Sequence, residues 1–476
     1  MGFVMRNHPV ASGGGVHPTV TILIQFKTGA KSIQIGFTDQ RLSPHAGSAI
    51  FCGWLTSTSW VETLRAVLPH PLPLSNDHLL PLDKALAFLH GLLADARKLT
   101  HVAYLRRDPL VPELLAIRRV ASQSSLSRFF QGFRSAAANL HCFRPLWQWG
   151  LNRLPSRKEG YTLDLDSTRL LHEDGQQEGV AVGYTKRGLK PCLHPLLAVL
   201  AEVRLVAQLW LRPGNAACGN NTVAFFLELW NQLPRHIRLR GVRADAGFCL
   251  PDLLALWEQL GVPYVVVAQL SQPIQRLLRG DLVWTETEVP GTEVAEREYQ
   301  SLGWPHARRL VLIRHRINER ERRGGKKLLD VPGYQFQALV TSIPATQMSG
   351  LAVWRYYNGR ADCENVIKEL QQGFALPSLC LRSFWATEAA LSLAALTYNL
   401  TVLFQRHLGW QQKVTAQSLR YWLFVTAGVL SHPAGRTTIK LAVPPRERAW
   451  WQRLWEKILS PIPNCHALEN RPTLNS

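Results

Sequence analysis

The chain contains the stretch Trp354-Arg-Tyr-Tyr-Asn-Gly-Arg-Ala-Asp-Cys-Glu-Asn-Val-Ile-Lys-Glu-Leu370, whose pattern predicts one helix. Its apolar residues have the three-and-four spacing of a buried helical face: Val366, Ile367 and Leu370. Arg360, Glu364 and Lys368 follow one another at steps of four, so they share one side of that helix. Such a stripe can be a solvated ladder of ion pairs. It can also place a metal-binding carboxylate between cations that hold phosphates, and the triple alone leaves both interpretations open.

A second acidic segment runs from Tyr161 to Asp166 and alternates like a strand. The alternation turns Asp164 and Asp166 to the same face as Thr162. Two carboxylates on one buried face are costly unless a cation lies beside them. Either aspartate can therefore be a metal ligand, and the alternation does not choose between them.

A third acid, Asp245, follows the strand predicted over 237–244. Gly247 permits a sharp turn there and lets the backbone come close to a ligand. An acid at the carboxyl end of a strand in an α/β sheet lies at the usual ligand crevice. The three acidic segments can therefore contribute to one site.

Together these segments resemble a known family. The pattern Tyr357-x2-Arg360-x3-Glu364 resembles the YREK signature of DDE transposases from bacterial insertion sequences, the transposase DDE domain group 1. The segments Asp166-Ser-Thr and Asp245-Ala-Gly-Phe resemble the first and second acidic motifs of that family. The resemblance extends from about residue 85 to the C-terminus, and the three motifs occur in the family's order.

The chain departs from the signature at its lysine. The family pattern expects a Lys seven residues after Glu364, where this chain has Gln371. Lys368, one helical turn after Glu364, is the candidate to take its place.

The resemblance implies a metal-dependent catalytic site. It selects Asp166 over Asp164 and implies that Asp166, Asp245 and Glu364 hold two divalent cations. Hard oxygen ligands favour Mg2+ or Mn2+ over softer metals. One metal activates a water or a DNA 3′-hydroxyl for attack on phosphorus, and the other stabilises the leaving oxygen. Tyr357 and Arg360 are implied to grip a phosphate or a distorted strand near the cut, and no tyrosine nucleophile is needed.

Composition favours a polyanionic partner. The 476 residues include 54 Lys and Arg against 34 acids, a formal net charge of +20. The cations are spread over most of the chain, which favours a DNA track over a membrane tag. Eight Cys without any C-x-x-C argue against a zinc finger and fit a reducing cytosol. No signal peptide is evident, and 389–404 is predicted to be a buried helix rather than a membrane span. We therefore expect a bacterial cytoplasmic protein associated with the nucleoid through DNA.

The N-terminal part is predicted to bind DNA. Residues 1–20 are expected to be a poorly ordered lead, followed by an N-terminal region over 21–150 with strands at 21–26 and 32–37 and then helices. Two helices over 108–134 suggest a helix-turn-helix. In that interpretation its basic residues contact phosphates: Arg118, Arg119 and Arg128. The alternative is an ordinary helical pair with solvated arginines.

The fold class is predicted to be α/β, with an RNase H-like catalytic core. The first part of the core spans 158–270, and the second part spans 346–410. Strands are expected at 161–166, at 179–184 and in one bent run over 194–210. Helix, strand, helix and strand then follow to residue 268, which is the order of an RNase H-like core.

Two further regions complete the predicted domains. Residues 271–345 have short alternating runs and are predicted to be a mainly β insertion, as the resemblance also implies. A basic loop over 314–327 is either a solvated turn or a contact to the DNA backbone. Residues 411–476 are predicted to be a helical basic region, in which Trp interleaved with Arg either packs a small subdomain or stacks on bases.

The predicted function is cut-and-paste DNA transposition. The protein would bind the terminal inverted repeats of an insertion sequence, cleave the DNA and join the ends to target DNA. Two ends must be brought together, so we expect at least a homodimer in the paired-end complex. The alternatives are a two-metal nuclease of the same fold without strand transfer and a catalytically inactive DNA-binding relic.

Overall fold

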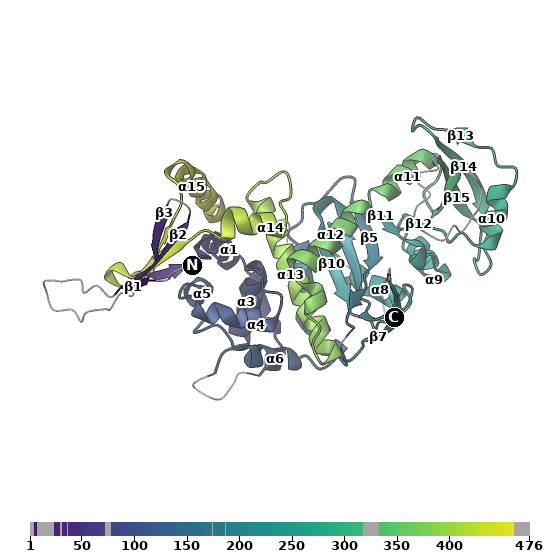
Figure 1. Cartoon of the computed structure of the whole chain (residues 1–476). Helices are drawn as coiled ribbons and strands as arrows, with labels where there is room; N and C mark the ends of the chain where they lie inside the picture. Colours follow the sequence, from purple (N-terminus) through teal and green to yellow (C-terminus); the bar gives the residue numbers. More distant parts are fainter. Residues whose placement is uncertain are drawn as a thin grey trace.

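The computed structural model describes residues 4–6, 23–28, 31–35, 37–71, 78–173, 175–185, 187–317 and 333–460. The molecule is elongated, with a helical region at one end, a sheet in the middle and an extension of that sheet at the other end (Figure 1). The long helix α13 (Phe384–His407) runs between the helical region and the sheet.

Nine strands of the described chain form one sheet, in the order β10-β9-β5-β11-β12-β16-β15-β14-β13. Their bounds are β5 (Tyr161–Ser167), β9 (Leu196–Leu200), β10 (Leu205–Trp210), β11 (Leu239–Ala244), β12 (Tyr264–Val267), β13 (Thr285–Glu286), β14 (Thr292–Tyr299), β15 (Arg308–Arg316) and β16 (Tyr334–Thr341). Strand β11 runs parallel to both β5 and β12, and the other neighbours are antiparallel. Strands β9 and β12 are almost wholly apolar, as expected of strands covered on both faces, whereas β5 and β11 between them also carry charged residues.

Two strand predictions were wrong. The run 179–184 was expected to be the second core strand, but it forms part of a separate small sheet of β6 (Leu170–Leu171), β8 (Gly188–Leu193) and β7 (Ala181–Thr185). The bent run over 194–210 is two antiparallel strands, β9 and β10. The chain reverses at Arg204, whose φ of 52° lies in the left-handed region. The turn places both apolar runs side by side in the main sheet.

The predicted β insertion is not a separate sheet. Its strands β14, β15 and β16 continue the main sheet from β12, and the insertion also contains the helix α10 (Gln272–Arg279), which the sequence analysis missed. Pro273 in the first turn is compatible with a helix start, and the burial of Ile274 and Leu278 fixes that helix. Most of the basic loop over 314–327 lies outside the described residues.

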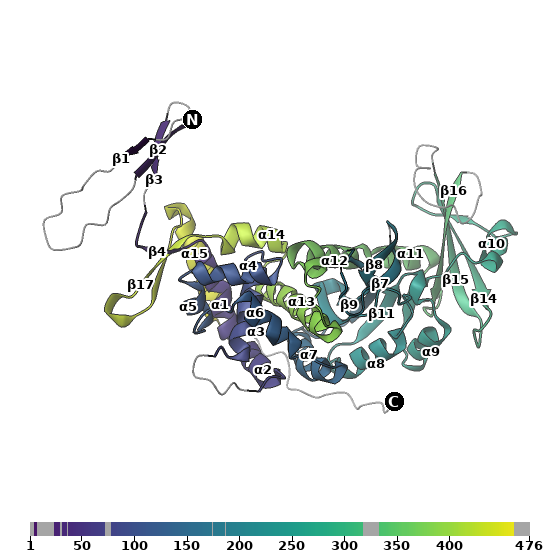
Figure 2. The ribbon, with the colours of Figure 1, turned by 60° about the horizontal axis from the view of Figure 1, so that its bottom comes forward.

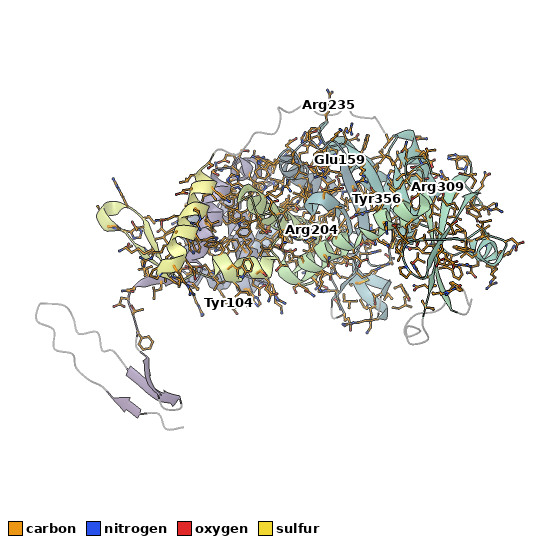
Figure 3. All side chains as sticks on the ribbon, turned by 90° about the horizontal axis from the view of Figure 1, so that it is seen from above. Tyr104, Glu159, Arg204, Arg235, Arg309 and Tyr356 are labelled. Carbon is orange, nitrogen blue, oxygen red and sulfur yellow. The ribbon has the colours of Figure 1, made fainter. Side chains whose placement is uncertain are left out.

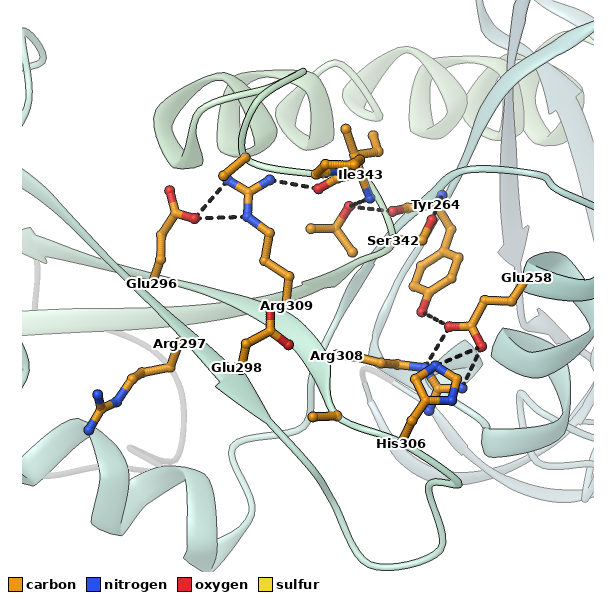
Figure 4. Close-up of a pocket in the computed structure, with 14 residues that line it drawn as sticks. Glu258, Tyr264, Glu296, Arg297, Glu298, His306, Arg308, Arg309, Ser342 and Ile343 are labelled. Atoms are coloured by element: carbon orange, nitrogen blue, oxygen red, sulfur yellow. Dashed lines mark hydrogen bonds and ion pairs between the residues drawn. The ribbon is translucent and has the colours of Figure 1, made fainter.

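Ion pairs fasten this extension to the core. A polar hollow of about 610 Å3 is lined by residues of both parts. In it, Glu258 accepts from Arg308 (2.7 and 2.9 Å) and from the Tyr264 hydroxyl (2.6 Å), and these bonds are drawn in Figure 4. Glu296 on β14 pairs with Arg309 (2.7 Å) and also accepts from the backbone N–H of Gly350 (2.9 Å). Gly350 is the first residue of α11, so the extension helps to position the helices that follow.

Helices cover the core sheet on two sides (Figure 2). Helices α8 (Thr222–Gln232) and α9 (Pro251–Gln259) pack against each other on one face. Helices α11 (Gly350–Asn358) and α12 (Ala361–Gly373) lie on the other, where the Tyr356 hydroxyl donates to Thr162 of β5 (3.1 Å). The face of β5 that carries Thr162, Asp164 and Asp166 is therefore the face covered by α11 and α12.

Helix α13 closes the edge of the sheet at β10. By length and composition it can span a membrane, but its most apolar stretch is wholly buried inside the protein, so the prediction of a buried helix is confirmed. The Asn399 side chain accepts from the Val206 N–H (2.9 Å) and donates to the Val206 carbonyl (2.7 Å). Glu388 accepts from the Leu211 N–H (2.8 Å). These polar side chains satisfy backbone groups that an edge strand leaves open.

Glu388 gives the fold a predicted pH dependence. Burial raises the pKa of Glu388 from about 4.5 to about 7. The hydrogen bonds that Asn139 and the Leu211 N–H donate to the carboxylate lower this pKa, but by less than burial raises it. Between these values the unfolded state releases a proton that the folded state keeps, so stability present below about pH 4.5 is lost as pH rises toward 7. We expect about 3 kcal/mol to be lost over this window. Urea unfolding at pH 5 and pH 8 checks this. In Glu388→Gln, the part of the pH dependence of the free energy of unfolding that comes from Glu388 should disappear. In Glu447→Gln, which changes a half-exposed glutamate, it should remain. An unchanged pH slope in Glu388→Gln would contradict the assignment.

The helical region contains α1 (Ala49–Thr56), α2 (Trp60–Val67), α3 (Pro81–Leu93), α4 (Leu99–Tyr104), α5 (Val111–Leu115), α6 (Gln123–Gln131) and α7 (Ala136–Leu151). Before it, β2 (Leu23–Thr28) and β3 (Lys31–Ile35) pair as the predicted hairpin. Strand β1 (Val4–Arg6), which lies in the stretch expected to be poorly ordered, pairs with β2. The rest of that stretch lies outside the described residues.

The prediction of a wholly helical C-terminal region was wrong. After α14 (Ala416–Leu419) and the π-helical turn η7 (Arg420–Phe424), the strands β17 (Gly428–Ser431) and β18 (Thr438–Leu441) form a hairpin. Pro433 and Gly435 interrupt a helix there, and β17 also pairs with β4 (Arg41–Ser43) from the other end of the chain. Helix α15 (Pro445–Leu459) packs on α1 with Trp451 buried, as the packing interpretation of the tryptophans expects.

Candidate active site

The helix predicted over 354–370 is broken in two. Helix α11 ends at Asn358 and α12 begins at Ala361. The Tyr356 carbonyl accepts from Arg243 of β11 (2.6 Å), and the Arg360 N–H donates to the Tyr357 carbonyl (2.9 Å). A Cβ on Gly359 would lie 2.4 Å from the Arg243 side chain, so glycine leaves room for this arginine. The break therefore results from a buried cation that takes a helical carbonyl.

The break turns Arg360 into the site. Its side chain is buried and its Nη2 lies 2.8 Å from Asp166 Oδ2, while its Nη1 lies 3.7 Å from Glu364 Oε1. The Glu364 side chain is 69% exposed, and Lys368 on the next turn is exposed. Neither interpretation of the triple describes all three residues. Arg360 is buried against Asp166 of β5, so the stripe is not a solvated ladder, and Lys368 faces solvent, so the two cations do not flank one site.

Asp166 and Asp245 follow neighbouring residues of two parallel strands. Leu165 of β5 pairs with Ala244 of β11, and each aspartate comes next in its chain. Asp245 begins a short 3-10 turn and accepts from the Gly247 N–H (3.0 Å). Burial raises the pKa of Asp166 to about 6, although the positive charge of Arg360 lowers it. The negative charges of Asp245 and Glu364 add to the rise. Asp245 and Glu364 therefore both act electrostatically on Asp166.

The donor set fits a hard divalent cation in its chemistry. It supplies three carboxylates, and the buried one, Asp166, is compensated at present by a guanidinium. Across the described part of the chain, however, no three acidic, His or Cys side chains gather closely enough to ligate one ion. Arg360 lies between Asp166 and Glu364 and keeps these two carboxylates apart.

The other aspartate of β5 has a structural partner. Asp164 is fully buried and accepts from Arg243 Nε (2.6 Å) and Nη2 (2.8 Å). Arg243 lies opposite Asp164 in the pairing of β5 with β11. Of the two aspartates that the alternation left open, Asp164 is therefore the one with a structural role, and the cation that it requires comes from the next strand.

The family described as transposase DDE domain group 1 matches residues 26–464. The chain belongs to this family. The family resemblance is thereby confirmed, whereas the YREK branch stays a prediction. No curated protein matches the chain. Among solved structures, the cryo-EM structure of the piggyBac transposase synaptic complex with hairpin DNA is similar at 13% identity over 81% of each chain, with a TM-score of 0.39, too low to carry an argument.

The two adjacent tyrosines of this DDE-family chain have different surroundings. Burial raises the pKa of Tyr357, and the negative charges of Asp245 and Asp166 raise it further, whereas the charge of Arg360 lowers it. The Tyr357 ring therefore borders the site. Tyr356 lies under the arginines of β11, with Arg243 5.2 Å from its ring centre. Figure 3 labels Tyr356 and also Arg204, which pairs with Asp362 of α12 (2.8 Å) and so ties α12 to the turn after β9.

Three polar residues beside the acids escaped the sequence analysis. The His194 Nδ1–H donates to the Ala216 carbonyl (2.9 Å), so its Nε2 accepts from the Ser167 hydroxyl (2.8 Å). Burial lowers the pKa of His194 to about 4, which keeps the ring neutral. Cys218 lies 3.6 Å from the same hydroxyl. Only the adjacency of Ser167 to Asp166 hinted at this cluster, since the partners come from distant segments.

The residue that replaces the signature lysine also has a clear position. Gln371 Nε2 donates to the Thr168 hydroxyl (2.7 Å), two residues beyond Asp166. The amide therefore links α12 to the segment after β5. Lys368 is exposed on another turn of the same helix, so its assignment as a substitute for this lysine stays a prediction.

The predicted helix-turn-helix lies in the helical region, away from the acids. Ser122 caps α6 by accepting from the Ser125 N–H (3.2 Å). Helix α6 packs on α3, α4 and α13, whereas α5 packs on α1 and α3. The three arginines proposed to contact phosphates are exposed: Arg118, Arg119 and Arg128. Their role in DNA binding stays a prediction.

Proposed function

We propose that this chain is an active DDE transposase that binds the terminal inverted repeats of an insertion sequence and catalyses metal-dependent cleavage and strand transfer. The observation that carries the proposal is the meeting of Asp166, Asp245 and Glu364, from three separate elements, around one buried arginine. Family membership and the net charge of +20 support a DNA substrate. A homodimer on paired ends and a location on the bacterial nucleoid belong to the same proposal.

The strand arrangement supports an RNase H-like core. Five strands lie in the order β10-β9-β5-β11-β12, with the first three antiparallel and the last three parallel. In sequence order these are strands 3-2-1-4-5, with helices α8 and α9 in the crossovers. The first acid lies on the central strand and the second at the end of its parallel neighbour, which is where an α/β sheet forms its crevice.

Each side chain has a proposed task. Asp166, Asp245 and Glu364 would hold two divalent cations, which activate the attacking hydroxyl and stabilise the leaving oxygen when bound. Glu364, exposed in the free protein, turns toward Asp166 for this purpose. Arg360 leaves Asp166 and donates to a phosphate of the strand being cut, a match for its planar fork of donors. Tyr357 borders the same phosphate and the neutral His194 holds Ser167 in place.

One experiment tests the function. Purified protein is incubated with a DNA fragment that carries the flanks of the reading frame, a target plasmid and Mg2+, beside Glu364→Ala. Cleavage with joining, lost in Glu364→Ala, is the expected result. Cleavage without joining would identify a nuclease instead. Tight binding without cleavage in either protein would identify a DNA-binding relic.

Arg360 should compete with metal in the absence of DNA. We expect Arg360→Gln to bind Mn2+ about tenfold more tightly than the wild type in the free protein, because the cation paired with Asp166 is gone. Electron paramagnetic resonance of free Mn2+ measures this directly. Arg355→Gln is the matched control, since Arg355 is an exposed arginine of α11 paired with Glu288. Equal Mn2+ affinities for all three proteins would show that Arg360 does not compete.

A further inference from the structure

The hairpin of β7 and β8 exposes an apolar face close to the candidate active site. Val182, Tyr184 and Leu189 are 58%, 77% and 70% exposed. Tyr184 and Leu189 are directly paired across the two strands, so their side chains lie on the same face. We call these three residues the hairpin face. Large apolar side chains gathered on one exposed face indicate a contact surface more often than a solvent surface.

The opposite face of the hairpin is firmly anchored. A Cβ on Gly183 would lie 2.1 Å from the Gly214 carbonyl oxygen, so this strand lies directly on the segment after β10. The Gly214 N–H donates to the Gly179 carbonyl (3.1 Å), and Leu193 bridges to Pro213. The hairpin cannot turn over to bury its apolar face, which therefore stays available to a partner.

The hairpin also lies where a cut strand would pass. Strand β6, which pairs with β8, begins three residues after Ser167 at the end of β5 that carries Asp166. The Ser167 hydroxyl bonds to His194, the residue directly after β8. The hairpin is thus built from the segments that flank the first catalytic acid.

Charge favours nucleic acid as the partner. The sequence over 179–193 contains Lys186, Arg187 and Lys190 and no acid. Arg187 is exposed beside the hairpin face, and Lys190 pairs with Glu173 (3.5 Å) outside the hairpin. The exposed Arg187 beside the apolar patch matches a partner that carries phosphates next to an apolar surface. In DNA that surface is the face of a base.

We propose that the hairpin face packs against base faces at the DNA end beside the cut. Base faces are covered inside a continuous duplex and become accessible at a flush terminus or where bases are unpaired. Tyr184 stacks on such a base, and Val182 and Leu189 cover its edge. The contact rests on the proposed function and deepens it, because the hairpin face distinguishes a broken or opened end from intact DNA.

The test compares three DNA probes that carry the element's own end sequence, in EDTA so that no cleavage occurs. One continues as intact duplex through the cleavage point, one stops there as a flush end, and one has unpaired bases there. We expect Tyr184→Ala/Leu189→Ser to bind intact duplex like the wild type. It should bind at least one of the other probes about tenfold more weakly. The affected probe then shows whether a terminal pair or unpaired bases are recognised.

Controls separate the two proposals. Leu302→Ser removes a fully exposed leucine of the sheet extension and should bind all probes like the wild type. Equal binding of every probe by the hairpin variant and the wild type would overturn the hairpin contact and leave the proposed function intact. A variant that loses self-association in sedimentation, with unchanged binding of all probes, would assign the hairpin face to a second copy and overturn the contact as well. A wild type that binds none of the probes would overturn the proposed function itself.

Discussion

Replacing Asp166 by Asn is expected to lower Mg2+-dependent cleavage of end DNA by about a thousandfold or more, with little change in DNA binding. The substitution keeps the size of the side chain and its acceptor for the Ser167 N–H (2.8 Å). Arg360 keeps Glu364 as a partner, so the variant should remain folded. The loss therefore falls on the chemistry, which needs the negative charge of Asp166. Gel assays of cleavage and of binding, run on the same DNA, measure the two effects separately.

Asp362→Asn is the matched control for this prediction. Asp362 lies on α12 two residues before Glu364, but its carboxylate pairs with Arg204 and its side chain is 44% exposed. We expect this variant to cleave within a few-fold of the wild type, because a half-exposed ion pair contributes little. Strong cleavage by Asp166→Asn, or an equally severe loss in Asp362→Asn, would show that the catalytic acids have been assigned to the wrong residues.

The candidate catalytic acids could be proposed from the sequence because each lies in a short segment that resembles a motif of the family, and that resemblance selected Asp166 over Asp164. Asp166 ends an alternating strand, Asp245 precedes a glycine turn, and Glu364 lies on a helix with a regular apolar face. Motifs of this kind depend on neighbours along the chain. Local pattern therefore sufficed to place these residues on the elements that carry them.

The break between α11 and α12 could not be predicted in the same way. The apolar period continues through 354–370, and Gly359 alone is compatible with a helix. What ends α11 is Arg243, more than a hundred residues earlier, which takes the Tyr356 carbonyl. Nothing in the local sequence records that contact. The same holds for β17, whose partner β4 lies near the other end of the chain.

The small sheet was misplaced for a related reason. The run 179–184 alternates like a core strand, yet Val182 and Tyr184 are exposed, and the real second strand is the continuous apolar run of β9. Alternation is typical of a strand with one wet face, and β9 is apolar throughout because both of its faces are covered. The buried strand β5 alternates as well, because its acids pair with Arg243 and Arg360. The alternating run at 179–184 and the apolar run of β9 are both visible in the sequence. Their order along the chain does not show which of the two joins the main sheet.

The second large effect is expected at Asp164, two residues before Asp166. Asp164→Asn should lower the free energy of unfolding by about 3–5 kcal/mol, because it leaves the Arg243 guanidinium buried without a countercharge. Urea unfolding at neutral pH measures the loss. Glu288→Gln, which removes one partner of the exposed pair with Arg355, should change stability by less than about 1 kcal/mol. A similarly small change for Asp164→Asn would contradict a structural role for the pair.

Replacing both partners separates the two roles of this ion pair. Asp164→Leu/Arg243→Met should recover much of the stability, since an apolar pair of similar volume is often as stable as a buried ion pair. It should not recover cleavage. Arg243 also holds the Tyr356 carbonyl and so maintains the break that turns Arg360 toward Asp166. A stable double variant with full cleavage would show that the break is not needed, whereas a stable and inactive one would place Arg243 among the residues that position the site.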